Sequence, residues 1–179
     1  MPKVEKRVIV NAPRQAVYDA WRNFENFPRF MSNIEEVRLL DGNRSHWKAK
    51  GPLGLDAEWD AELTLDEPER AVGWRSIDGE SSVTTAGRVN FEDIGSATRL
   101  DVTLHYDAPA GALGNVVAKL FADPERQVED DLGRFKTIIE QGWEASGLAR
   151  VAAGQPHGSS MGATTESDIA AMGDGEVRV

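Results

Sequence analysis

The sequence contains no cysteine. This absence excludes disulfides, thiolate nucleophiles and cysteine-ligated metals, and it leaves the redox compartment open. Histidine is scarce as well, and His46, His105 and His157 fall in separate segments of the chain. Three scattered histidines without cysteine make no recognisable metal site. We therefore predict no bound metal and no other cofactor.

Basic residues are outnumbered by acidic ones. The chain has 20 Lys and Arg against 30 Asp and Glu, for a formal net charge of -10 at pH 7. A surface that binds nucleic acid needs clustered basic side chains, so nucleic acid is not an expected partner. No run approaches the ~18 consecutive apolar residues of a membrane span, and the first ten residues lack the apolar core of a signal peptide. We expect a cytoplasmic protein.

Period-two alternation is what the sequence has in abundance. In "LDAEWDAELTLD", residues 55 to 66, apolar and polar residues alternate, as in a β-strand with one dry face and one wet face. Similar runs separated by short turns, one of them at Asp41-Gly42, predict six strands between residues 34 and 107. A β-branched run at residues 3 to 10 adds a first strand. The turns are short, so neighbouring strands should pair antiparallel.

Two short helices are predicted between the first and second strands. "NAPRQAVYDAWRNF" has helical spacing of its apolar residues, with Asn11 as a possible cap. "ENFPRFM" begins a second short helix that carries Phe27, Phe30 and Met31. An aromatic helix next to a sheet opening suggests a lid over that opening, and plain core packing is the alternative.

A long C-terminal helix is predicted from residue 112 to about residue 143, where apolar residues keep helical spacing. Pro124 interrupts it, and Asp123 can cap a restarted segment, so we expect a break or kink there. The acidic run from Glu129 to Asp131 is predicted to lie on its exposed side. Residues 147–179 are rich in Gly, Ser, Thr and Ala, which indicates a flexible tail after one domain at residues 1–146.

Several stretches resemble one known family. They are "APRQAVYDAWRNFENFPRFM", "SHWKAKGPLG", "EWDAELTLDEPER", "VGWRS", "GRVNFED", "YDAPAGALG" and "DPERQVEDDLGRFKTIIEQG". The chain resembles the START-like (SRPBCC, helix-grip) superfamily, and within it the bacterial polyketide cyclase/dehydrase group related to coenzyme-Q-binding START domains. The resemblance implies an α+β helix-grip fold, in which a seven-stranded curved antiparallel sheet wraps around the long C-terminal helix. It also implies a deep apolar cavity between sheet and helix.

The strand faces decide which side chains could line that cavity. Alternation turns Ser45, Ser76, Thr85 and the Tyr106 hydroxyl inward, while His46 falls on the wet face. No charged strand residue clearly points inward, which suits acid–base catalysis poorly and suits the orientation of an apolar ligand. We predict no catalytic residue and the following ligand-binding residues: Phe27, Phe30, Trp47, Trp59, Trp74, Thr85, Tyr106, Val117 and Phe121.

Three functions remain open from the sequence. The leading hypothesis is noncatalytic binding of a hydrophobic small molecule, such as a quinone, a lipid or a polyketide-like compound. The second is a polyketide cyclase or dehydratase of the aromatase kind, which an inward Arg, His or Asp would favour. The third is an interaction domain with a vestigial cavity, which a closed interior would favour. Small neighbours of the inward indoles, Ala49, Ala57, Ala61 and Gly87, suggest unfilled space. The pattern specifies no oligomeric state.

Overall fold

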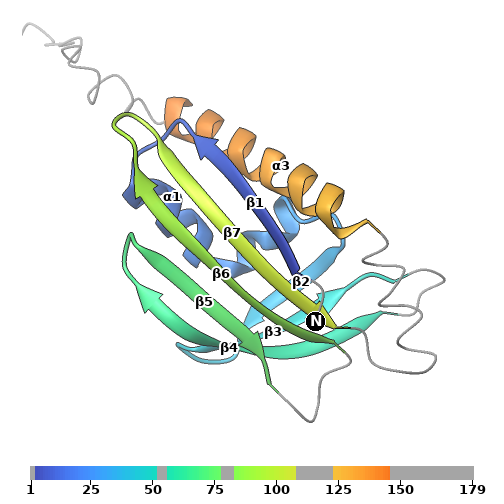
Figure 1. Cartoon of the computed structure of the whole chain (residues 1–179). Coiled ribbons are helices and arrows are strands. Elements are labelled where there is room, and N and C mark those ends of the chain that lie inside the picture. Colours follow the sequence, from blue (N-terminus) through green and yellow to red (C-terminus); the bar gives the residue numbers. More distant parts are fainter. Residues whose placement is uncertain (1–2, 52–55, 78–82, 108–122, 146–179) are drawn as a thin grey trace, which may run out of the picture.

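Seven antiparallel strands form one sheet in the computed structural model (Figure 1). The structure describes residues 3–51, 56–77, 83–107 and 123–145. The strands are β1 (Lys3–Val10), β2 (Ile34–Leu39), β3 (Arg44–Ala49), β4 (Ala57–Glu67), β5 (Ala71–Ser76), β6 (Thr84–Asp93) and β7 (Thr98–Asp107). Their order across the sheet is β1-β7-β6-β5-β4-β3-β2. Strands β2 to β7 therefore pair in chain order, as their short connections predict, and β1 joins the sheet beside β7.

Turn chemistry sets the hairpins. Oδ1 of Asp41 accepts hydrogen bonds from the backbone N–H groups of Asn43 and Arg44, both at 2.8 Å, which closes the predicted turn between β2 and β3. Between β6 and β7, Gly95 has a φ of 97°, a conformation that glycine adopts without steric cost. Its N–H donates to Oδ1 of Asp93 at 2.8 Å. The local sequence therefore specifies where these strands reverse.

Two short helices follow β1, as predicted. They are α1 (Arg14–Arg22) and the 3-10 helix η1 (Phe24–Arg29). The prediction that Asn11 caps the first helix is wrong. The helix α1 begins at Arg14, three residues after Asn11, so the cap position belongs to Pro13. Pro13 has an extended backbone conformation and makes no side-chain cap bond. The backbone N–H of Asn11 donates instead to the Glu140 carboxylate at 2.7 Å.

The C-terminal helix α3 (Pro124–Ala145) begins at the predicted proline. Oδ1 of Asp123 accepts a hydrogen bond from the Arg126 N–H at 3.2 Å, which is the expected cap. Proline fits the first helical position because its missing N–H has no partner there anyway. Residues 108–122 and 146–179 lie outside the described residues. The predictions of a helix over residues 112–122 and of a flexible tail over residues 147–179 therefore stay predictions.

The sheet curves around α3. On one side, Nζ of Lys6 in β1 lies 3.0 Å from Glu129, and Nζ of Lys136 donates to the Ile9 carbonyl at 2.7 Å. On the other side, Nε of Arg134 donates to the Phe30 carbonyl, just before β2, at 2.8 Å. Because β1 and β2 are the two edges of the sheet, a helix tied near both requires a curved sheet. The α+β helix-grip prediction is confirmed, and Figure 1 shows α1 and α3 on the same side of the sheet.

The two faces of the sheet divide as the alternation predicts. Ser45, Trp47 and Ala49 of β3 are buried, and so are Ala57, Trp59 and Ala61 of β4. The alternation of β4 weakens after Ala61, where the register with β5 shifts between Leu63 and Leu65 and both leucines are half-buried. The core is completed by side chains from the helices, of which Val17, Trp21, Leu132 and Phe135 are buried.

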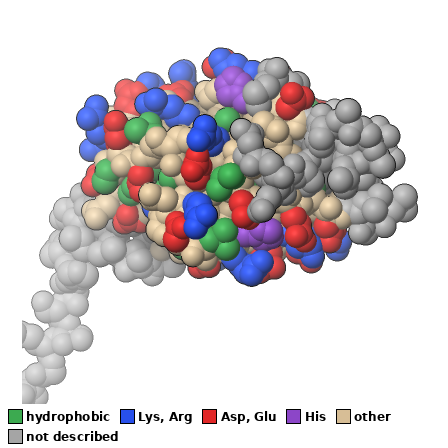
Figure 2. Space-filling view, turned by 90° about the horizontal axis from the view of Figure 1, so that it is seen from below, with side chains coloured by type: hydrophobic (Ala, Val, Ile, Leu, Met, Phe, Trp, Pro, Cys, Tyr) green, Lys and Arg blue, Asp and Glu red, His purple; other side chains and the backbone are tan. Residues whose placement is uncertain are grey.

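The outer face of the sheet carries contacts between polar and charged side chains. Nδ1 of His46 lies 2.7 Å from Asp60, and Nζ of Lys48 lies 3.2 Å from both Glu35 and Asp56. His46 thus lies on the polar face, as predicted. Figure 2 shows basic and acidic side chains interspersed over one face of the molecule, with hydrophobic side chains only in small separate patches. Among the described residues, no helix is long and apolar enough to cross a membrane.

Candidate ligand-binding cavity

A cavity of about 80 Å³ lies between the inner face of the sheet, η1 and α3. It is lined by Phe27, Met31, Asn33, Ile34, Trp47, Ala49, Trp59, Trp74, Val83, Thr85, Leu104, Gln127 and Asp131. This volume exceeds the space that one water molecule needs and is about half that of an engineered cavity of about 150 Å³ that binds benzene. The interior is therefore not solid at this position.

Two stacked indoles form one wall. Trp47 and Trp59 face each other across β3 and β4, with ring centroids 6.0 Å apart and planes 13° apart. Both are buried. Nε1 of Trp47 donates a hydrogen bond to Oγ of Ser45 at 2.8 Å. The inward hydroxyl of Ser45 is therefore already hydrogen-bonded to an indole. Trp59 lines the same cavity as Gln127 and Asp131 of α3.

A third indole, that of Trp74, fills the space that Gly87 leaves. The two residues are partners across β5 and β6, and a Cβ added to Gly87 would lie 2.2 Å from a carbon of the Trp74 ring. The expectation that Gly87 leaves unfilled space is therefore wrong. Ala49 lines the cavity, so the same expectation holds for that alanine.

The predicted ligand-binding residues divide into three groups. Phe27, Trp47, Trp59, Trp74 and Thr85 line the cavity. Two others do not belong to its lining: Phe30 is buried, with its ring centroid 5.0 Å from that of Phe135, and Tyr106 is half-buried opposite Thr85. The last two, Val117 and Phe121, lie outside the described residues. Whether any of these side chains binds a ligand stays a prediction.

Asp131 is the functional candidate that the sequence analysis missed. It was predicted on the exposed side of the helix, and that prediction is wrong, because Asp131 is only 3% exposed and lines the cavity. Its position carries a signal for this. It follows the core-packed Val128 by three residues and precedes the buried Phe135 by four, and these spacings share one helical face.

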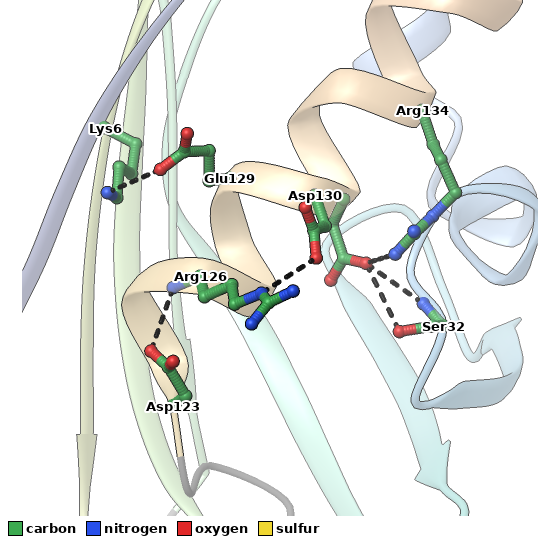
Figure 3. Close-up of polar contacts among 8 residues, drawn as sticks. Lys6, Ser32, Asp123, Arg126, Glu129, Asp130 and Arg134 are labelled. Carbon is green, nitrogen blue, oxygen red and sulfur yellow. Dashed lines mark hydrogen bonds and ion pairs between the residues drawn. The ribbon is translucent and has the colours of Figure 1, made fainter.

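Three donors converge on one oxygen of this carboxylate. Oδ1 of Asp131 accepts hydrogen bonds from the Ser32 N–H at 3.2 Å, from Oγ of Ser32 at 3.4 Å, and from the Arg134 guanidinium. In Figure 3, dashed lines from Arg134 on the helix and from Ser32 on the neighbouring segment meet at one carboxylate oxygen. Burial raises the pKa of Asp131 above its ordinary value, and the Ser32 and Arg134 contacts offset this only in part.

The described lining of the cavity is therefore mostly apolar, with a few polar groups. Asn33, Gln127 and Asp131 supply its amide and carboxyl groups, Thr85 adds a hydroxyl, and most of the remaining lining is aromatic or aliphatic. Asp131 is the one ionisable side chain among the described residues that line it. A carboxyl group in this setting can accept a hydrogen bond from a ligand, and it can also exchange a proton with one.

The family model for polyketide cyclase / dehydrase and lipid transport matches residues 10–132 of the chain. The chain is 32% identical over 150 residues to an uncharacterized 17.2 kDa protein of Streptomyces lincolnensis. This match covers 82% of this chain and 95% of that relative. It is also 32% identical to a Deinococcus radiodurans protein of known structure, with a TM-score of 0.65 over 79% of this chain and 99% of that one.

More distant structures share the fold. The Zhui aromatase/cyclase of a Streptomyces species is 20% identical, with a TM-score of 0.65 over 87% of this chain and 99% of its own. A START superfamily protein of Mycobacterium smegmatis is 17% identical, with a TM-score of 0.60 over 76% of this chain and 98% of its own. The predicted resemblance is thereby confirmed at the level of family and fold.

Proposed function

Because this chain belongs to the polyketide cyclase/dehydrase and lipid transport family, we propose that it binds a hydrophobic small molecule without changing it chemically. The site is the cavity between the sheet and α3, and the ligand class is a quinone, a lipid or a polyketide-like compound. The observation that carries the proposal is the convergence of Trp47, Trp59 and Trp74 on one apolar cavity. Ligand sites are concave and mostly apolar, with a few polar groups that fix orientation.

The volume of the cavity bears on how a ligand enters. Pockets for drug-sized ligands measure roughly 300–1,000 Å³, and this cavity measures about 80 Å³. A ring system therefore has to displace lining side chains. Met31, two residues after the end of η1, lines the cavity, and its unbranched side chain adapts its shape readily. The proposed route of entry thus passes the segment that contains Phe27 and Met31, for which the sequence suggests either a lid or plain core packing.

The experiment is a titration with N-phenyl-1-naphthylamine, a neutral apolar dye that accepts excitation energy from indoles. We expect saturable quenching of tryptophan emission together with dye emission, and weaker binding by the Trp59→Ala variant. N-acetyltryptophanamide serves as the control for collisional quenching, which rises without saturation. Unsaturable quenching of the folded protein would contradict the proposal. Native mass spectrometry and organic extraction of protein purified from its own host then identify the ligand.

A second candidate function is that of a cyclase or dehydratase, and Asp131 is the observation that favours it. General acid–base catalysis needs a titratable group within reach of the substrate, with a pKa shifted toward the working pH. Asp131 lines the cavity and has a raised pKa. The two functions separate when the extracted compound is incubated with purified protein. An unchanged compound supports binding alone, and a loss of water or a new ring that depends on Asp131 supports catalysis.

A further inference from the structure

The second oxygen of the Asp131 carboxylate has no donor among the described residues. Both hydrogen bonds from Ser32 and the contact with Arg134 go to Oδ1. The side chain of Asp131 is 5% exposed, and the residue lines the cavity. Oδ2 is not among the fully buried polar atoms that lack a partner, so it keeps some accessible surface. A hydrogen bond donated to a charged group is among the stronger ones. Oδ2 is therefore an acceptor that a molecule in the cavity can satisfy.

The charge of this site is already balanced. Arg134 pairs with Asp131, and no second cation is among the described residues that line the cavity. A ligand carboxylate would bring a second buried anion without a partner, which is strongly unfavourable. A ligand ammonium would leave an excess positive charge beside Arg134. The pairing therefore favours a neutral ligand group that donates a hydrogen bond.

We propose that Asp131 selects, among hydrophobic ligands, neutral aromatic molecules that carry a hydroxyl group, with that hydroxyl donating to Oδ2. The aromatic body lies among the indoles that line the rest of the cavity. This inference rests on the proposed binding function and narrows it. Phenols and enols meet the requirement, whereas a quinone offers only acceptors to a carboxylate oxygen, and a fatty acid brings an unpaired negative charge.

The test compares biphenyls that differ in one substituent, by their displacement of N-phenyl-1-naphthylamine at pH 7. We expect 4-phenylphenol to bind the wild-type protein at least ~10-fold more tightly than 4-methylbiphenyl, because hydrogen bonds to charged groups are among the stronger ones. 4-Biphenylcarboxylic acid should bind more weakly than either. This comparison uses the unmodified protein, so it does not depend on the folding of any variant.

The Asp131→Asn variant reverses the chemistry of the same position. Ser32 and Arg134 should hold the amide oxygen where Oδ1 lies, which places the amide NH₂ group at the position of Oδ2. The preference for 4-phenylphenol over 4-methylbiphenyl should then fall about tenfold, and 4-acetylbiphenyl, an acceptor, should bind more tightly than it does to the wild type. Asp130→Asn is the matched control, because Asp130 is exposed and does not line the cavity. It should keep the wild-type preference.

The outcomes separate the two proposals. If the dye and the biphenyls all fail to bind the wild-type protein, both the binding function and this inference are wrong. If the dye binds but 4-phenylphenol and 4-methylbiphenyl bind equally, only the inference is overturned. The same conclusion follows if Asp131→Asn keeps the wild-type preference while it binds the dye normally.

Discussion

The indole of Trp74 lies against the backbone of Gly87, its cross-strand partner, at a distance that no other residue type permits. A Cβ at Gly87 would lie 2.2, 2.6 and 2.8 Å from three carbons of the Trp74 ring. The φ of Gly87 is not positive, so its backbone conformation does not require glycine. Glycine is required here because the Trp74 ring approaches the backbone so closely. The position of a cavity-lining indole thus depends on the absence of a side chain on the neighbouring strand.

Replacing Gly87 with alanine should displace Trp74. Because the added methyl group would overlap the Trp74 ring, we expect a loss of ~1–3 kcal/mol in the free energy of unfolding. Dye binding should change as well, since Trp74 lines the cavity. Urea denaturation and dye titration measure the two effects. Gly133→Ala is the control: nothing lies within 4 Å of its added Cβ, and alanine in a helix should stabilise by ~0.5–1 kcal/mol. Equal effects at both glycines would contradict the packing argument.

Trp59 and Phe135 form a second matched pair. Phe135 is 1% exposed and contacts the rings of Trp21 and Phe30, whereas Trp59 lines the cavity. Phe135→Ala should destabilise the protein by the ~3–5 kcal/mol typical of a large core truncation. Trp59→Ala should cost less than ~3 kcal/mol, because one side of its ring already borders empty space. Chemical denaturation measures both. A larger loss for Trp59→Ala than for Phe135→Ala would show that Trp59 is ordinary core.

Tyr18→Phe should remove part of a stabilisation that depends on pH. The Tyr18 hydroxyl donates to Asp66 at 2.5 Å, and Arg22 donates to the same carboxylate at 2.8 Å. Burial alone would raise the pKa of Asp66, but these two donors outweigh it and hold the pKa below its ordinary value. A lowered folded-state pKa stabilises the protein above the unfolded value of about 3.9, and this contribution is lost as pH falls through the folded pKa.

We therefore expect Tyr18→Phe to destabilise by ~1–2 kcal/mol at pH 7, with a smaller difference from the wild type at pH 3. Urea denaturation at both pH values provides the measurement. The same contact can be followed from the tyrosine side, because burial and the Asp66 hydrogen bond raise the pKa of Tyr18 to about 12. A pH-independent difference would mean that the lost hydroxyl acts through packing and not through Asp66.

Removal of residues 147–179 should leave the thermal midpoint nearly unchanged. This prediction comes from composition, since the segment is rich in Gly, Ser, Thr and Ala and offers few apolar anchors. Ordering such a segment costs ~1–2 kcal/mol per residue in backbone entropy. Differential scanning calorimetry of the shortened chain measures the effect. A drop of many degrees would show that the segment docks on the domain or on a partner subunit.

The sequence by itself determined the strand faces and the turns. Alternation placed Trp47 and Trp59 on the dry face, and both line the cavity. Asp41 marked a hairpin, and Asp123 with Pro124 marked the point where the predicted helix restarts, which is where α3 begins. These features were predictable because the pleat of a strand, a tight turn and a helix cap each depend on residues that are close in the sequence.

Only the tertiary structure decided the chemistry of the cavity. The backbone N–H of Ser32 donates a hydrogen bond to Asp131, although the two residues are 99 positions apart in the sequence. Trp74 fills the space beside Gly87 because two strands bring them into register. Whether an acid is buried, and whether a small residue leaves space, depends on side chains that other elements supply. Local periodicity therefore fixed which side of each element faces inward, and long-range packing decided what remained open there.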